Sequence, residues 1–257
     1  MSPPFLLEEI MEHTRILARL DELLGKNDYE GAEKLLLYWY KDACDSGDKR
    51  LQLLMLNESV GLYRKLNQES NCLQAVRNAL QLIEDMGIAN NIGAGTTYLN
   101  CATAHQAFGR PEVALPLFEK ALNVYEAGLP ATDQRRGGLY NNMALTLVEL
   151  KRYEDAYQYY ERAITIMSEQ NLWLEVAITY LNIASAKEAE LGLVAAEFEI
   201  DALLDKATEL LDNHGDEFPC GYYAFVCEKC ASVFGYFGRF MYKNTLLERA
   251  RDIYDRA

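Results

Sequence analysis

Glycine and proline are scarce in this sequence. Its 257 residues include only 16 glycines and 6 prolines. This scarcity excludes a turn-rich all-β protein and a disordered chain, because both need more of these residues. No segment alternates valine, isoleucine or threonine with polar residues, so strands are not indicated either. Since half of the residues are hydrophobic, the chain can bury a core in one large domain or two small ones.

Basic residues are also few compared with acidic ones. Lysine and arginine together number 25, against 39 aspartates and glutamates, and the formal net charge is −14. Phosphate backbones and anionic membrane surfaces repel such a chain, so we expect neither nucleic acid nor a membrane as its partner. A basic peptide or protein would be attracted. Acidic residues that only coat solvated helix faces would explain the same composition, and both interpretations stay open.

The sequence contains neither a long apolar run nor a cysteine framework. No run approaches the ~18 residues of a transmembrane helix, and the N-terminus lacks the basic and apolar regions of a signal peptide. Six scattered cysteines predict free thiols in a reducing, cytoplasmic compartment. Cys227 and Cys230, with Cys220 upstream, form one close pair. Structural zinc sites usually need two pairs, so we expect buried thiols and no metal or other cofactor.

One short pattern recurs along the chain at intervals of about 42 residues. It consists of a large residue, an asparagine two positions later and a small residue two positions after that. Successive asparagines are 43, 42 and 40 residues apart. The copies are Met55-Leu-Asn57-Glu-Ser59, Tyr98-Leu-Asn100-Cys-Ala102, Tyr140-Asn-Asn142-Met-Ala144 and Tyr180-Leu-Asn182-Ile-Ala184. A fixed period of this length is typical of repeat proteins.

A turn and a second amphipathic pattern follow each copy. In it, alanines and large residues recur three or four positions apart, which places them on one face of a helix. Alanine is needed where two helices approach closely, and the large residue fills the groove beside it. The clearest copies are Ala75-x3-Ala79-x2-Leu82, Ala114-x3-Phe118-x2-Ala121 and Ala156-x3-Tyr160-x2-Ala163. Two helices per period predict a chain of helical hairpins.

The pattern predicts twelve helices. Their expected ranges are 5–25, 28–45, 48–67, 69–86, 91–108, 111–127, 132–150, 153–169, 172–191, 195–213, 217–238 and 240–256. Glycine-rich segments should separate the hairpins, among them Gly93-Ala-Gly95 and the pair Gly137-Gly138. The hairpin that begins near residue 172 has about one extra helical turn after Leu191.

At these residues the sequence resembles the tetratricopeptide-repeat (TPR) family, in the long-hairpin variety of kinesin light chains and of bacterial peptide-sensing regulators. The resemblance covers nearly the whole chain. It implies an all-α fold, a right-handed superhelical solenoid of about six hairpins and twelve helices, with residues 1–257 as a single domain. Ala18 and Lys229 replace the asparagine in the first and last repeats, as expected where one face of a repeat meets solvent.

The asparagine series is the candidate binding site. An asparagine side chain carries one acceptor and two donors, so it can bond both the N–H and the C=O of a peptide laid beside it. Neighbouring first helices lie about 8–10 Å apart, and an extended chain rises about 3.3 Å per residue. One asparagine per repeat would meet roughly every third ligand residue. The alternative is that each asparagine bonds a neighbouring helix or water. The series comprises Asn57, Asn100, Asn142 and Asn182.

In related TPR proteins, asparagines at this position line a concave groove and hold a peptide backbone, and the resemblance implies the same here. The residues one helical turn away would complete the groove. They mix apolar, polar and acidic groups, which favours a ligand with basic residues. They are Thr103, Gln106, Leu145, Val148, Glu149, Ser185 and Glu188.

We therefore expect a non-enzymatic module that binds a protein or an extended peptide. The three histidines lie in different repeats, and no nucleophile, base and orienting group can be found at catalytic spacing. One alternative is a sensor that binds a short signalling peptide. Another is a structural adaptor that self-assembles through its convex face or its terminal repeats. The last helix keeps the apolar residues Ile253 and Tyr254, so it either meets a second copy or packs onto its own hairpin.

Overall fold

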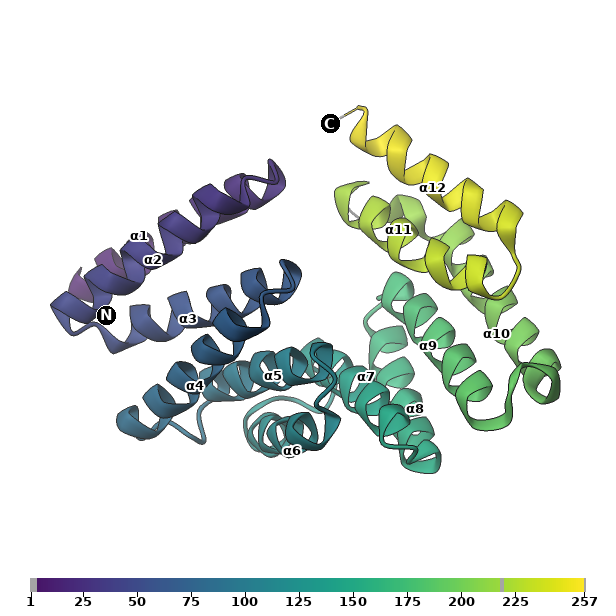
Figure 1. The fold of residues 1–257 in the computed structure, drawn as a ribbon, viewed down its shortest axis with the longest axis horizontal. Helices are drawn as coiled ribbons and strands as arrows, with labels where there is room; N and C mark the ends of the chain where they lie inside the picture. Colours follow the sequence, from purple (N-terminus) through teal and green to yellow (C-terminus); the bar gives the residue numbers. More distant parts are fainter. Residues whose placement is uncertain (1–3, 218–219, 257) are drawn as a thin grey trace. The chain divides into compact units, whose positions relative to one another are not determined.

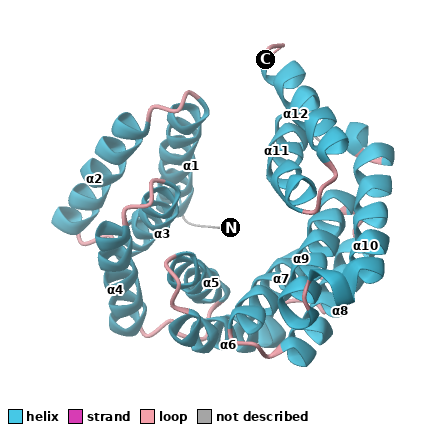
Figure 2. Ribbon diagram, turned by 45° about the vertical axis from the view of Figure 1, so that its right-hand side comes forward, coloured by secondary structure: helices cyan, strands magenta, loops and turns pink. Residues whose placement is uncertain are grey.

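The protein is all-helical. The computed structural model describes residues 4–217 and 220–256, and within these ranges it has twelve α-helices, one short 3-10 helix and no strand (Figures 1 and 2). Every helix begins and ends within three residues of its predicted bounds. The α-helices are α1 (Pro4–Gly25), α2 (Tyr29–Ser46), α3 (Lys49–Lys65), α4 (Glu69–Met86), α5 (Ile92–Ala107), α6 (Pro111–Gly128), α7 (Gln134–Glu149), α8 (Tyr153–Glu169), α9 (Trp173–Leu191), α10 (Leu193–Asn213), α11 (Cys220–Tyr236) and α12 (Phe240–Tyr254).

The chain forms two compact units. Unit 1, Met1–Gly128, contains the hairpins α1–α2, α3–α4 and α5–α6. Unit 2, Leu129–Ala257, contains α7–α8, α9–α10 and α11–α12. The expectation that all residues belong to one domain stays a prediction.

Most hairpins turn by the same backbone device. After α7, Lys151 adopts a left-handed conformation, with φ of 59°. Its N–H donates to Val148 O at 2.9 Å, and the next N–H, from Arg152, donates to Leu147 O at 2.8 Å. This pair of bonds is a Schellman motif, which satisfies the last carbonyls of the helix. The same left-handed position recurs in four other hairpins, at Asn27, Asn67, Gly109 and Gly238. The five turns therefore give hairpins of similar geometry.

The α9–α10 hairpin turns differently. Gly192 alone links the two helices, with φ of 81° and ψ of 154°, a combination that only glycine adopts readily. Helix α10 consequently begins at Leu193, two residues before its predicted start. Helices α9 and α10 have 19 and 21 residues and are the longest in unit 2.

Alanines make the close contacts between paired helices. Ala102 of α5 and Ala114 and Ala121 of α6 are fully buried, and Phe118 fills the space beside them. In unit 2, alanines of α9, α10 and α11 belong to one core cluster with leucines and Phe234. The alternation of small and large residues predicted from the sequence is thus the hairpin interface.

The prediction that two glycine-rich segments form turns was wrong. Gly93 and Gly95 lie in the first turn of α5, and Gly137 and Gly138 lie in α7. A Cβ on Gly95 would come within 2.8 Å of Tyr125 Cε1 and 2.9 Å of Val124 Cγ1. Glycine is therefore used here because helix α6 approaches the α5 backbone closely, and not because the chain turns.

The last helix packs largely onto its own hairpin. Ile253 is half-buried against the core cluster of unit 2. The Tyr254 hydroxyl donates to Glu228 Oε2 on α11 at 3.2 Å. Of the two alternatives for these residues, the structure therefore shows the contact with α11. Among the described residues, no helix has the length and apolar character needed to cross a membrane.

The close approach of α6 to α5 makes Gly95 a sensitive position. We expect Gly95→Ala to lower the free energy of unfolding by about 1–3 kcal/mol, because the added methyl overpacks the interface. Gly61 of α3 is the control: a Cβ there would meet nothing within 4 Å, so Gly61→Ala should stabilise by about 0.5–1 kcal/mol. Urea unfolding of both variants measures the difference. Equal changes in the two variants would contradict the packing explanation.

Candidate functional site

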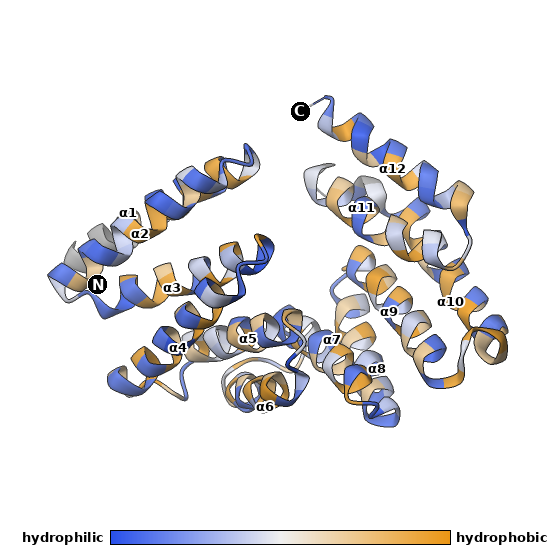
Figure 3. Cartoon of the chain, viewed as in Figure 1, coloured by the Kyte–Doolittle hydropathy of each residue, from blue (hydrophilic) through white to orange (hydrophobic). Residues whose placement is uncertain are grey.

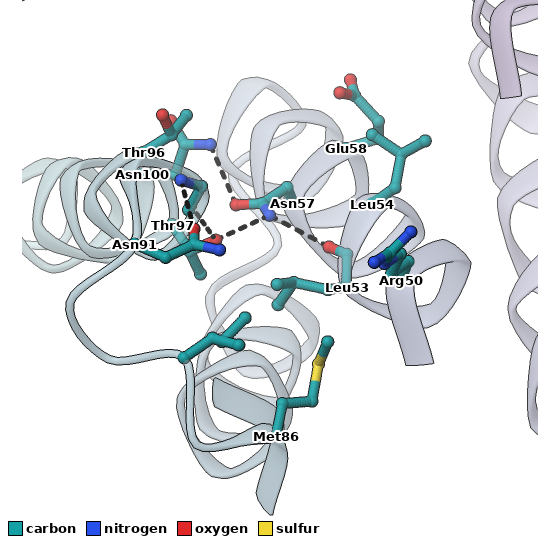
Figure 4. A pocket seen from close by; sticks show the side chains of 12 residues that line it. Arg50, Leu53, Leu54, Asn57, Glu58, Met86, Asn91, Thr96, Thr97 and Asn100 are labelled. Atoms are coloured by element: carbon teal, nitrogen blue, oxygen red, sulfur yellow. Dashed lines mark hydrogen bonds between the residues drawn. The ribbon is translucent and has the colours of Figure 1, made fainter. Parts of the chain in front are cut away.

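A pocket of about 540 Å³ opens in unit 1 between α3 and α5 (Figure 4). Its apolar part is made by Leu53, Leu54, Met86 and Ile88. Polar groups lie along the side formed by α5 and the loop before it, and two charged residues stand on α3. These polar and charged residues are Asn57, Asn91, Thr96, Thr97, Asn100, Arg50 and Glu58. The pocket thus combines room for an apolar side chain with several amide groups.

Asn57 connects the two first helices, α3 and α5. Its Nδ2 donates to Leu53 O at 3.0 Å and to Thr97 Oγ1 at 2.9 Å. Its Oδ1 accepts from Asn100 Nδ2 at 3.0 Å. Figure 4 shows these bonds converging on the Asn57 side chain. Both amide hydrogens of Asn57 are therefore bonded within the protein, as the alternative reading of the asparagine series expected for each member.

Asn100 keeps hydrogen-bonding capacity that faces the pocket. Of its two amide hydrogens, one bonds to Asn57. The other hydrogen and the carbonyl oxygen have no partner within the described part of the chain. One donor and one acceptor on the same amide match the C=O and N–H of a peptide backbone. Asn91 contributes less, because its Oδ1 caps α5 by accepting from Gly93 N at 2.7 Å.

The same arrangement occurs in unit 2, between α7 and α9. Asn182 Nδ2 donates to Asn141 Oδ1 at 3.1 Å. The Thr179 hydroxyl is shared between Glu175 O, at 2.8 Å, and Asn141 Oδ1, at 3.3 Å. A buried threonine and an asparagine three residues later thus hold an asparagine of the preceding first helix in both units. In unit 2 that asparagine is Asn141, and not the predicted Asn142.

The unit 1 pocket is lined by one acidic residue, Glu58, and one basic residue, Arg50. Glu58 is half-buried, and its burial, together with the negative charge of Asp21 on α1, raises the pKa of the Glu58 carboxyl. Arg50 lies two turns earlier on α3, and its side chain is exposed. A ligand cation beside Glu58 would relieve the repulsion between the two carboxylates.

The remaining predicted residues lie on the first helices of their hairpins. In unit 1, Thr103 and Gln106 are on α5, and the Thr103 hydroxyl donates to Leu99 O at 2.8 Å. In unit 2, Ser185 on α9 donates to Leu181 O at 3.2 Å. The other members in unit 2 are Asn142, Leu145 and Glu149 on α7 and Asn182 and Glu188 on α9. Helices α7 and α9 are in contact, so these residues belong to adjacent helices.

Sequence reasoning missed the threonines and the apolar lining. The tetrapeptide Thr-Tyr-Leu-Asn occurs twice, at 97–100 and 179–182. This repetition could have indicated that threonine acts together with asparagine. No comparable signal exists for Met86 and Ile88, because they reach the pocket from the end of α4 and the following loop.

The cysteines are not arranged as a metal site. Cys227 and Cys230 are buried in the core of unit 2, and burial raises the pKa of the Cys230 thiol to about 12. Within residues 4–217 and 220–256, no three His, Cys, Asp or Glu side chains are grouped so that they could hold a metal ion. The Cys220 side chain lies outside the described part.

Two stretches of the sequence match family models. Residues 95–132 and residues 138–168 each match a model described as a tetratricopeptide repeat. The first stretch includes most of α5 and all of α6, and the second includes most of α7 and α8. Each match therefore corresponds to one helical hairpin. No protein with a curated function matches the sequence.

Solved structures with a similar fold extend the likeness along the chain. BtubC (BKLC) from P. vanneervenii is 16% identical, with a TM-score of 0.58, over 90% of this chain and 91% of that chain. A putative kinesin light chain from P. anserina with nearly identical TPR-like repeats is 13% identical, with a TM-score of 0.55, over 80% of this chain and 96% of that chain.

The MamA protein is 15% identical, with a TM-score of 0.51, over 79% of this chain and 94% of that chain. At these identities the likeness is one of fold. The predicted resemblance is nevertheless confirmed, because the family models match two of the four hairpins that carry the asparagine pattern, those of Asn100 and Asn142. With helical hairpins along its described length and two of them matched by the family models, this chain contains tetratricopeptide repeats and shares the fold of the TPR-like repeats of that kinesin light chain.

Proposed function

We propose that this TPR protein binds an extended peptide, or the tail of a partner protein, in the pocket of unit 1. The observation that carries the proposal is the Asn100 amide, which lines a 540 Å³ pocket and keeps one donor and one acceptor without partners among the described residues. The matched repeats support the coarser statement, that the protein is a scaffold for protein interactions, since stacked repeats create extended binding surfaces.

The shape and lining of the pocket favour a peptide with one apolar anchor. Leu53, Leu54 and Met86 supply an apolar surface beside the Asn100 amide. An extended backbone that bonds to Asn100 would place alternate side chains on opposite sides. One of these side chains would enter the apolar part of the pocket. Asn57 would act indirectly, since its bond to Asn100 orients that amide.

Glu58 favours a basic ligand residue next to the anchor. Glu58 and Asp21 repel each other, and a lysine or arginine of the ligand would pair with Glu58. The net charge of −14 would attract such a ligand from a distance. The predicted residues of unit 2, among them Asn142, Asn182 and Glu188, are proposed as a second binding stretch. We also propose a reducing cytoplasmic setting, supported by the free thiols of all five cysteines whose side chains are described.

Exposed apolar residues on α12 favour a second candidate function, an adaptor that self-associates through its terminal hairpin. Phe240 and Met241 are both largely exposed at the start of this helix. Sedimentation of the wild type beside Phe240→Ser/Met241→Ser would reveal such an adaptor as a dimer that only the wild type forms.

Panning a displayed library of random peptides tests the main proposal. We expect enriched peptides to share an apolar residue with a lysine or arginine nearby. In fluorescence anisotropy, Asn100→Ala should bind a synthetic enriched peptide about two- to tenfold more weakly, since one hydrogen bond contributes about 0.5–1.5 kcal/mol. Asn123→Ala, at an exposed position on α6, is the matched control. Circular dichroism checks the folding of both variants. Equal affinity of wild type and Asn100→Ala would refute the role of this amide.

We expect the Glu58 carboxylate to lower the stability of the protein and to strengthen the binding of a basic peptide. Because its pKa is raised on folding above the ordinary 4.5, the folded protein holds this proton more tightly than the unfolded chain. The free energy of unfolding therefore falls as the pH rises from the pKa of Glu58 in the unfolded chain to its pKa in the folded protein. Above the folded pKa, Glu58 causes no further decrease. Glu58→Gln removes the repulsion from Asp21, so the variant should be more stable than wild type at pH 7 but not at pH 4.

The same Glu58→Gln variant should bind a basic peptide about tenfold more weakly, because a charge-assisted bond is lost. Thermal unfolding at both pH values and anisotropy at pH 7 measure the two effects. Glu119→Gln, at an exposed position on α6, should change neither. A loss of stability in Glu58→Gln at pH 7 would show that the carboxylate has a favourable partner in the folded protein.

A further inference from the structure

The first two turns of α10 extend beyond the start of α12, its neighbour in unit 2. Tyr153, the first residue of α8, donates its hydroxyl to Ala189 O at 3.1 Å, two residues before the end of α9. On the other side, Arg239, just before α12, pairs with Asp201 at 2.9 Å and with Asp205 at 3.1 Å. Asp201 is already the ninth residue of α10. About 12 Å of α10 therefore precedes its ion pair with the α12 end, at 1.5 Å per residue.

One face of this segment of α10 is buried in the core of unit 2, and the opposite face is exposed to solvent. Ala196 and Ile200 are buried in the core cluster of unit 2. Val194 and Phe198, one turn apart, are 89% and 87% exposed. They share a helix face with Asp201, which places them on the side of α10 that α12 contacts further along. The segment is thus rigidly held while two large apolar side chains remain in solvent.

Two more apolar residues adjoin this face. Leu191 and Leu193 flank Gly192, and both are exposed. Figure 3 shows the resulting hydrophobic colouring at the α9–α10 turn. Single exposed apolar residues are common, but a contiguous group of large ones marks a surface that another molecule covers. We call Leu191, Leu193, Val194 and Phe198 the α9–α10 knob.

Acidic residues surround the knob. Residues 186–201 contain five acidic residues and one basic residue, Lys187, which is paired with Glu199 at 2.9 Å. Glu197 is exposed beside Phe198. The acidic residues are Glu188, Glu190, Glu197, Glu199 and Asp201. A partner that covers the knob would therefore bring it close to a negatively charged rim.

We propose that the α9–α10 knob is a docking surface, separate from the peptide pocket, for a basic amphipathic helix of a partner protein. Val194 and Phe198 have the spacing of one helical turn and can pack into the side-chain grooves of a second helix. Lysine or arginine residues along that helix would face the acidic rim. An anionic membrane and a second copy of this chain are both disfavoured by repulsion from the same carboxylates.

Fluorescence anisotropy with a model ligand tests the proposal. The probe is an amphipathic leucine/lysine peptide of about fourteen residues, roughly four helical turns. We expect Val194→Ser/Phe198→Ser to bind it at least about tenfold more weakly than wild type, since burial of two large side chains is lost. Glu197→Lys, which leaves the apolar residues in place, should also weaken binding. A leucine/glutamate peptide of the same length should bind at least about tenfold more weakly than the lysine peptide.

Two controls separate this surface from others. Ile92→Ser/Val113→Ser removes two exposed apolar residues of unit 1 and should leave binding unchanged. Because the leucine/lysine probe would also suit the peptide pocket, the knob variant and its parent are compared in an Asn100→Ala/Glu58→Gln background as well, where the loss of affinity should be the same. Failure of the pocket proposal would then not affect this result. Circular dichroism confirms that the knob variant folds, as expected for exposed positions.

Three results would overturn the proposal. The first is equal affinity of the wild type and Val194→Ser/Phe198→Ser for the leucine/lysine peptide. The second is equal affinity of the wild type for the glutamate peptide, which would remove the role of the acidic rim. The third is sedimentation of the wild type as a dimer that the knob variant does not form, which would identify a second copy as the occupant.

Discussion

Close contact between the two helices of each hairpin is the constraint on which the rest of the structure depends. Buried alanines, such as Ala102 and Ala114, and the glycine at position 95 let the backbones approach, and large residues such as Phe118 fill the space beside them. Because each hairpin is rigid, its first helix presents a fixed row of side chains to the next hairpin. The polar contacts between hairpins, and therefore the pocket, exist only because this distance is set.

Adjacent hairpins are joined by side-chain hydrogen bonds between their first helices. Asn57 in unit 1 and Asn141 in unit 2 each meet a threonine and an asparagine of the next first helix. A half-buried amide must find partners, so these bonds fix how the two helices align. In unit 1 they also leave the Asn100 amide oriented toward an apolar pocket. In the proposed mode of binding, Asn57 would have a structural role and Asn100 a binding role, so equivalent residues of a series need not share one function.

The acidic character of the chain has different consequences at its two candidate surfaces. In the pocket, Glu58 is half-buried near Asp21, so its negative charge destabilises the folded protein unless a cation of a ligand lies beside it. Around the α9–α10 knob most of the carboxylates are exposed, so they would attract the proposed basic partner at little cost to stability. The pocket fits one apolar side chain of an extended peptide, whereas the knob is an exposed helix face that fits the side-chain grooves of a partner helix. Two partners of similar charge would therefore be distinguished by shape.

The sequence by itself determined the helices and their pairing, because these follow from local physics. Capping residues, left-handed turns such as that at Asn67 and the spacing of alanines act within a few residues of one another, so all twelve helices were predicted to within three residues. The tertiary structure decided what depends on distant neighbours. Gly95 looked like a turn residue until Tyr125 was seen beside it, and Asn141 replaced Asn142 because a one-residue difference turns a helical side chain by about 100°. The exposure of Phe198 likewise follows only from how far α10 extends past α12, which no local pattern encodes.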